Sequence, residues 1–232
     1  MIPLRDANPS ATRPFVTIAL IVLNSLAFFY EIALSERGLQ QLFFTLGMVP
    51  ARVGLFPAHP DVTFGDAVFP LFTSMFLHGG WMHLIGNMWF LWIFGDNIED
   101  YLGHLRYLFF YLLCGLGAGI THTLFNWNSL IPSIGASGAV AGVLGAYLLL
   151  YPKARVLTLI PAFFLFMVEL PAVVILLYWF VIQFFSGAAS IGAEGGGVAW
   201  WAHVGGFVLG FALVKRFGGR HRRPAVHYRI VD

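Results

Sequence analysis

The sequence predicts an all-α membrane protein, a six-transmembrane-helix bundle in which a short fourth helix starts inside the membrane. Of the 232 residues, 59% are hydrophobic and only 10% are charged, whereas soluble domains carry about 25% charged residues. Six apolar runs follow one another along the chain, and strand-like alternation is absent from them. A soluble chain of this size would need more charge to cover its surface, and a bilayer removes that requirement.

The six apolar runs define the expected organisation of the chain. They cover residues 15–34, 80–94, 107–125, 137–151, 169–185 and 197–214. We therefore expect a cytoplasmic N-terminus over residues 1–14, a membrane domain over residues 15–214 and a basic cytoplasmic tail over residues 215–232. Pro171 fits the first turn of the fifth helix, where its missing N–H costs little; a longer, kinked helix from Leu159 is the alternative.

Lysine and arginine predict the orientation. With both termini in the cytoplasm, only Arg37 and Arg52, of the 13 lysines and arginines, lie on the outer side, which agrees with the positive-inside rule. The first apolar run follows a segment without a small-residue cleavage site, so we interpret it as a retained helix rather than a signal peptide. Cys114 is the single cysteine, so an intramolecular disulfide is excluded.

The fourth apolar run is too short to cross a bilayer. From Ser137 to Pro152 it measures about 22 Å at about 1.5 Å per residue, against a hydrocarbon core of about 30 Å. The preceding segment, residues 126–135, is rich in Asn, Ser, Pro and Gly. Non-helical backbone at membrane depth is tolerated only where protein buries it or water reaches it. The sequence therefore predicts a hydrated cavity, open to the outside, with Ser137 at its floor.

Three further polar side chains are expected at a depth similar to that of Ser137. His203 lies in the sixth run, and His83 and Asn87 lie four residues apart on one face of the second helix. Polar groups inside the membrane are costly and are interpreted by default as functional.

Glycines are spaced so that the fourth and sixth helices can approach closely. Small residues four apart allow backbones to come together, and a short serine can reach a histidine on another helix only across such a contact. Two glycines follow Ser137 at this spacing and two follow His203; they are Gly138, Gly142, Gly206 and Gly210.

Each of these signals has a simpler explanation when it is taken alone. A Gly-x-Ser-Gly sequence occurs by chance, and Ala139 excludes the Gly-x-Ser-x-Gly elbow of soluble hydrolases. A membrane serine usually bonds back to the preceding turn. The histidines could hydrogen-bond between helices, and the glycines could serve packing only. An ion pathway through His78, His122 and Glu169 is a further alternative. The coincidence of all the signals favours a catalytic site.

Three stretches resemble motifs of the rhomboid family of intramembrane serine proteases. Residues 78–87 (HGGWMHLIGN) are similar to the family's second-helix motif, residues 135–139 (GASGA) to its nucleophile motif, and residues 202–206 (AHVGG) with Gly210 to its last-helix motif. Their order and spacing match, and the resemblance covers nearly the whole chain from the first to the sixth helix.

The resemblance implies a role for each site residue. Ser137 would be the nucleophile and His203 the general base, while His83, Asn87 and the Ser137 N–H would bind the oxyanion. Structural support would come from a further group: His78, Glu99, Gly135, Gly138, Gly142, Gly206 and Gly210. First-turn N–H groups of the fourth helix would face the developing negative charge.

Two positions depart from the family pattern. Phe69 and Pro70 occupy the place of a Trp-Arg pair that many members carry in the first outer loop. Ala141 stands where many members place an aromatic residue beneath the histidine ring. Another residue must therefore orient His203.

The resemblance also implies substrates, surroundings and location. Transmembrane proteins would be cut in or just outside the bilayer, after a small residue. We expect no metal, cofactor or nucleic-acid partner, because no such motif is present. The lack of a transit peptide or extra soluble domain suggests the plasma membrane of a bacterium. A catalytically inactive rhomboid-like chaperone is the main alternative, although Ser137 and His203 are both present; a small transporter would be expected to show half-repeats, and we find none.

Overall fold

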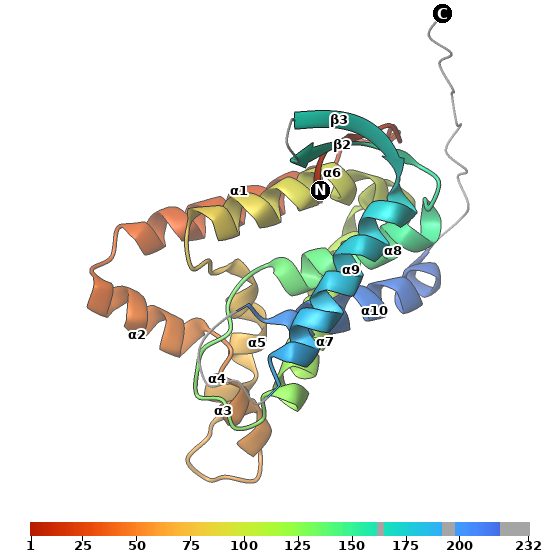
Figure 1. Ribbon diagram of the computed structural model, residues 1–232. Helices are drawn as coiled ribbons and strands as arrows, with labels where there is room; N and C mark the ends of the chain where they lie inside the picture. Colours follow the sequence, from red (N-terminus) through yellow and green to blue (C-terminus); the bar gives the residue numbers. More distant parts are fainter. Residues whose placement is uncertain (162–164, 192–197, 219–232) are drawn as a thin grey trace, which may run out of the picture.

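The computed structural model describes residues 1–161, 165–191 and 198–218. Six long helices coincide with the six apolar runs (Figure 1): α1 (Phe15–Ile32), α6 (Trp81–Leu102), α7 (His104–Phe125), α8 (Ser137–Leu150), α9 (Ala172–Ala189) and α10 (Trp200–Phe217). Among the described residues, three of them, α1, α7 and α9, are long and apolar enough to cross a membrane. The chain is therefore a mostly helical integral membrane protein.

Helix α8 lies at the centre of the packing. It contacts α7, α10 and α6, and α1 packs along α6 (Figure 1). Every residue from Gly138 to Leu148 is buried, so this 14-residue helix is covered on all sides. Small residues make such burial feasible, because neighbouring helices can approach α8 from several directions.

The segment before α8 is non-helical, as the composition of residues 126–135 indicates. Protein groups satisfy part of its backbone: the Met48 and Ser133 backbones exchange two N–H···O bonds of 3.0 and 2.7 Å, and the Gly135 N–H donates to the Ser74 carbonyl at 2.8 Å. Paired polar groups of this kind allow irregular backbone to stay inside a packed domain.

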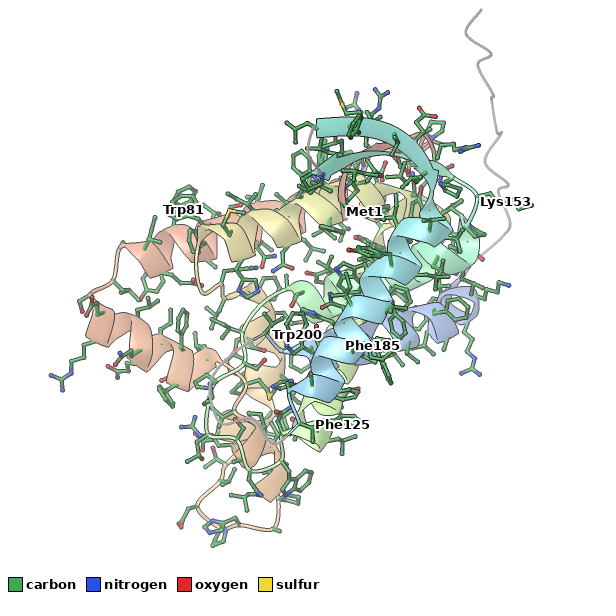
Figure 2. The ribbon with its side chains drawn as sticks, in the orientation of Figure 1. Met1, Trp81, Phe125, Lys153, Phe185 and Trp200 are labelled. Carbon is green, nitrogen blue, oxygen red and sulfur yellow. The ribbon has the colours of Figure 1, made fainter. Side chains whose placement is uncertain are left out.

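The expectation of an entirely α-helical fold is wrong in one region. A three-stranded antiparallel sheet, in the order β1-β2-β3, is formed by β1 (Ile2–Asp6), β2 (Arg155–Pro161) and β3 (Leu165–Pro171). It lies over the part of α6 that is distant from Trp81, with Lys153 beside it (Figure 2). Branched side chains favour extended structure in β2, where Val156 and Thr158, two residues apart, are fully buried. Pro171 is the last residue of β3 and directly precedes α9, so the prediction that it lies in the first turn of this helix is off by one residue. Leu159 lies in β2, so the kinked-helix alternative is wrong.

The first 14 residues pack against the helices. Polar side chains tie them to the C-terminal half of α6: Asn8 to Asn97, Ser10 to Asp96 and Thr12 to Asp100. Of the expected basic tail, residues 215–217 continue α10, and residues 219–232 lie outside the described residues.

A lobe of short helices connects α1 to α6. It contains α2 (Glu36–Leu46), α3 (Pro50–Leu55), α4 (Phe64–Ala67), α5 (Phe69–Thr73) and the 3₁₀ turn η1 (Ser74–Phe76). The lobe lies on the side of the molecule away from the sheet (Figure 1). Pro70 occupies the first turn of α5, where a missing N–H is tolerated.

Candidate active site

Ser137 and His203 are in direct contact. Ser137 is the first residue of α8, and His203 lies in the first turn of α10. The Ser137 Oγ and the His203 Nε2 are 2.7 Å apart, which is a normal hydrogen-bond distance. His203 is buried, with 8% of its surface exposed.

Glycine backbones make this short contact feasible. A Cβ on Gly206 would overlap the Gly138 carbonyl, and a Cβ on Gly210 would overlap the Gly142 backbone. A Cβ on Gly142 would also meet the Cys114 side chain. Helices α8 and α10 therefore touch backbone to backbone, at a separation that only glycine permits at these positions.

The other nitrogen of His203 contacts a residue that the sequence interpretation did not identify. The His203 Nδ1 lies 2.6 Å from the Oε1 of Gln183, a residue of α9 that is only 6% exposed. An amide oxygen can only accept, so Nδ1 carries the proton and Nε2 presents its lone pair to the Ser137 hydroxyl. The signal was available, since Gln183 is a polar side chain within an apolar helix.

Two tryptophans flank the His203 ring. The Trp179 ring lies 5.8 Å from it, tilted by 36°, and the Trp200 ring lies 6.2 Å from it, nearly perpendicular. Trp179 comes from α9 and Trp200 from α10. Ala141, on α8, provides no aromatic ring, so the aromatic surroundings of His203 come from other helices.

His83 approaches the backbone just before Ser137. The Gly79 N–H donates to the His83 Nδ1 at 3.4 Å, so neutral His83 carries its proton on Nε2. A Cβ on Gly135 would lie 2.6 Å from that nitrogen, and Gly135 has a φ of 128°. Both observations explain a glycine at this position, and they place an N–H donor beside the start of α8.

Asn87 presents an unused hydrogen-bond donor. It lies one turn after His83 on α6, with 7% of its surface exposed. Its Nδ2 has no partner among the residues that the structure describes. A buried donor without a partner is costly, and such costs are typical of groups retained for function.

All four side chains line one cavity of about 940 Å³. Apolar side chains form part of its wall, and the loop before α8 forms another part. The apolar group comprises Met82, Phe90, Val140, Leu144 and Trp179, and the loop contributes Ser129, Ile131, Pro132, Ser133 and Ile134. Substrate pockets in proteins have this size and a similar mixture of apolar walls with a few polar groups.

The remaining polar residues differ in their relation to the cavity. The His78 N–H donates to the carboxylate of Glu31 at 3.2 Å, and the His78 ring packs edge-on against His83 at 5.1 Å. His122 also lines the cavity, whereas Glu169 lies on β3. The proposed ion-pathway set is therefore not assembled in one place.

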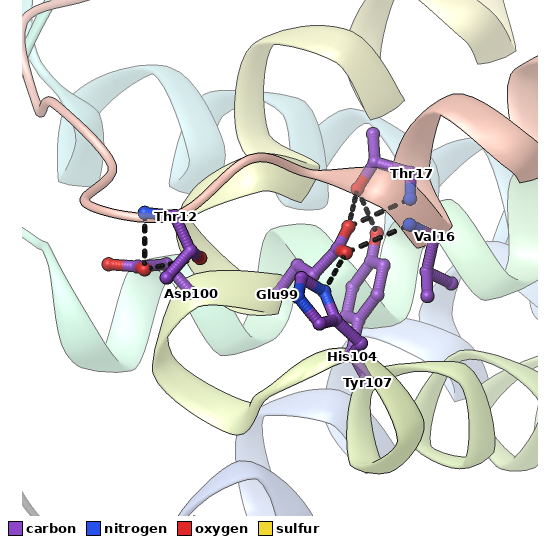
Figure 3. Close-up of polar contacts among 7 residues, drawn as sticks. All are labelled: Thr12, Val16, Thr17, Glu99, Asp100, His104 and Tyr107. Atoms are coloured by element: carbon purple, nitrogen blue, oxygen red, sulfur yellow. Dashed lines mark hydrogen bonds and ion pairs between the residues drawn. The ribbon is translucent and has the colours of Figure 1, made fainter.

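Glu99 joins α6 to the start of α1 (Figure 3). Its fully buried carboxylate accepts from the N–H groups of Val16 and Thr17 at 2.8 Å each and from the Thr17 hydroxyl at 2.7 Å. The His104 Nδ1 lies 2.6 Å from the same carboxylate. A carboxylate in this position satisfies the free N–H groups of a helix N-terminus.

Comparisons with known proteins point to one family. The rhomboid domain family model matches residues 65–219. The chain is 33% identical over 156 residues to RHOMBOID-like protein 6, mitochondrial, of Arabidopsis thaliana, and this match covers 64% of the chain and 43% of that protein. It is 32% identical over 147 residues to Rhomboid protein 1, mitochondrial, of Saccharomyces cerevisiae, covering 59% of the chain and 38% of that protein. The chain therefore spans less than half the length of these relatives.

Proposed function

The chain belongs to the rhomboid family, and from this premise we propose that it is a serine endopeptidase that cleaves transmembrane proteins in or near the bilayer. The observation that carries the proposal is the 2.7 Å contact between the Ser137 Oγ and the His203 Nε2 at the edge of a cavity. A serine is a weak nucleophile until a neighbouring base accepts its proton, and His203 is in position to do so.

The first step would form an acyl-enzyme. The Ser137 Oγ attacks the scissile carbonyl carbon while its proton passes to the His203 Nε2. The resulting tetrahedral oxyanion collapses, the C–N bond breaks, and the leaving amine takes the proton from His203. The amino-terminal part of the substrate is then held as an ester on Ser137.

Three N–H donors would stabilise the oxyanion. They are the His83 Nε2–H, the Asn87 Nδ2–H and the Ser137 backbone N–H in the first turn of α8. Support comes from the proton on His83 Nε2 and from the unpartnered Asn87 Nδ2. Donors that are held in place before reaction stabilise developing charge without reorganisation.

Water would complete the cycle. His203 takes a proton from water as the water oxygen attacks the ester carbon, and Ser137 regains the proton when the second tetrahedral intermediate collapses to a carboxylic acid. The cavity of about 940 Å³ has room for both a peptide segment and this water.

The same proposal covers the membrane arrangement. Helices α1, α6, α7, α8, α9 and α10 would form six spans, with Ser137 below the outer surface and both termini in the cytoplasm. Support comes from the 14-residue length of α8 and the distribution of lysine and arginine. The bacterial plasma membrane stays a prediction, and the matched relatives with mitochondrial names give it no support.

A fluorophosphonate probe and a transmembrane model substrate test the function. Purified protein in detergent should be labelled at Ser137 and should cleave the substrate. Ser137→Ala and His203→Ala should each abolish cleavage, and the double variant should be no worse than either, because the two residues act as one unit. Full cleavage by Ser137→Ala in a clean preparation would refute the proposal, and a folded wild-type protein without labelling or cleavage would favour the inactive chaperone.

A further inference from the structure

Two residues of α9 meet the His203 ring. Trp179 and Gln183 are four residues apart, so they lie on one face of the helix. The Trp179 ring lies 5.8 Å from the His203 ring, and the Gln183 Oε1 lies 2.6 Å from the His203 Nδ1. We propose that Gln183 is the positioning residue of the general base, holding His203 in the tautomer and orientation that Ser137 needs; this inference rests on the proposed protease function.

The tautomer argument gives Gln183 a specific role. A neutral imidazole carries one proton, which can sit on either ring nitrogen. General-base action on Ser137 requires the lone pair on Nε2, and therefore the proton on Nδ1. The Gln183 oxygen accepts a hydrogen bond only from the tautomer that carries this proton, so it favours the reactive form of His203.

Burial strengthens the preference of His203 for the tautomer with the proton on Nδ1. Gln183 is 6% exposed and His203 is 8% exposed, so water competes weakly for the Nδ1 proton. With the Gln183 amide oriented as in this structure, the opposite tautomer would leave two acceptors, Nδ1 and Oε1, facing each other without a proton between them. Leaving a buried polar group unsatisfied is costly, and the usual size of that cost corresponds to a preference of about fivefold to about 160-fold for the reactive tautomer.

The position of α9 supports the contact. Gly187 lies one turn after Gln183, and a Cβ there would come within 3.3 Å of the Trp200 and Trp201 side chains. Helix α9 is therefore close to α10 at the level of His203. Gln183 does not line the cavity, so it acts on His203 rather than on substrate. This role is independent of Ala141, which offers neither a ring nor a polar atom.

Gln183→Met is the decisive variant, because it keeps a long unbranched side chain and removes the acceptor oxygen. We expect kcat to fall by about 10–100-fold, the loss seen when the hydrogen-bond partner that orients a metal-ligating histidine is removed. KM should change little, since Gln183 is outside the cavity. Gln183→Glu retains an oxygen acceptor and should recover most of the lost activity. Phe185→Leu, on the same helix and 67% exposed, is the matched control and should keep the wild-type kcat.

A spectroscopic readout separates positioning from a packing role. Nitrogen-15 NMR of the His203 ring, recorded in inactive Ser137→Ala protein, reports which nitrogen carries the proton. We expect the Nδ1–H form in this background, and a larger share of the Nε2–H form when Gln183→Met is added. The reverse tautomer in the Ser137→Ala protein, or no change on adding Gln183→Met, would overturn the inference.

The kinetic outcomes are also distinct. A folded Gln183→Met enzyme with wild-type kcat would overturn the inference while leaving the protease function intact. A loss of activity that only follows the folded fraction, and that Gln183→Glu shares, would also overturn it. If wild-type protein is neither labelled by fluorophosphonate nor able to cleave, the proposed function fails instead. Gln183→Leu provides a second acceptor-free variant should Gln183→Met not fold.

Discussion

Replacing Asn87 by alanine should separate catalysis from stability. The Asn87 side chain faces the cavity, and its Nδ2 has no partner among the described residues. If this donor binds the oxyanion, its hydrogen bond forms mainly in the transition state rather than with bound substrate. Asn87→Ala should therefore lower kcat and leave KM nearly unchanged.

The expected change in kcat is much larger than the expected change in stability. Loss of one oxyanion donor costs about 10²–10³ in kcat, or about 2.7–4 kcal/mol. Folding should be affected much less, because no hydrogen bond from Nδ2 is lost. An unsatisfied buried donor itself costs about 1–3 kcal/mol, so its removal offsets the packing lost on truncation, and the melting temperature should stay close to that of the wild type.

Asn97 on the same helix provides the matched control. It exchanges two hydrogen bonds with Asn8, at 2.8 and 2.9 Å, and is 2% exposed. Each such bond contributes about 0.5–1.5 kcal/mol. Asn97→Ala should therefore lower the melting temperature while leaving kcat per folded molecule unchanged.

The assay is cleavage of a transmembrane substrate at saturating and limiting concentrations, with thermal unfolding in the same detergent. Normal turnover by a folded Asn87→Ala enzyme would refute the oxyanion role. A fall in melting temperature as large as that of Asn97→Ala, with activity following the folded fraction, would show that Asn87 is structural.

Three further changes test the supporting structure. Gly210→Ala would force a methyl group into the Gly142 backbone. Overpacking of this kind costs about 1–3 kcal/mol, so the melting temperature and the cleavage rate should both fall. An unchanged melting temperature would contradict the close contact between α8 and α10. Glu99→Ala should destabilise by about 3 kcal/mol or more, because it leaves buried N–H groups at the start of α1 unpaired, and denaturation should detect this loss. Burial raises the pKa of Asp6 to about 7. The stability that its protonated form contributes is therefore fully present below about pH 4 and is lost as the pH rises through 7. Asp6→Asn should remove this pH dependence of the melting temperature, and an unchanged pH profile in the variant would exclude Asp6 as its source.

Much of the helical framework follows from local sequence. Long apolar runs with few charges cannot remain in water, and in a bilayer they must satisfy their backbone groups internally. The expected runs therefore coincide with α1, α6, α7, α8, α9 and α10. Most helix ends lie within four residues of the expected ones, but α6 continues eight residues beyond the expected run, to Leu102. Its last turns carry polar residues that hydrogen-bond to the first 17 residues of the chain, a contact that hydrophobicity does not indicate.

The candidate site could be proposed from the sequence because its residues lie in short motifs. His83 and Asn87 share a helical face by spacing alone, and Ser137 follows a glycine-rich turn. Whether Ser137 and His203 meet depends on the approach of α8 to α10, which brings together residues 66 positions apart. Glycine spacing indicated that approach, and the contact itself belongs to the tertiary structure.

The sheet and the partner of His203 were decided by tertiary structure. Residues 155–161 and 165–171 are apolar enough to resemble part of a helix. In the structure these two segments pair with each other, and residues 155–161 also pair with residues 2–6 at the far end of the chain. Gln183 stands 20 positions from His203 on another helix, and local propensity says nothing about which ring nitrogen an amide will meet. Sequence alone therefore determined the apolar framework and the reactive side chains. The orientation of those side chains depended on packing between distant segments, because a hydrogen bond requires a particular distance and direction in space.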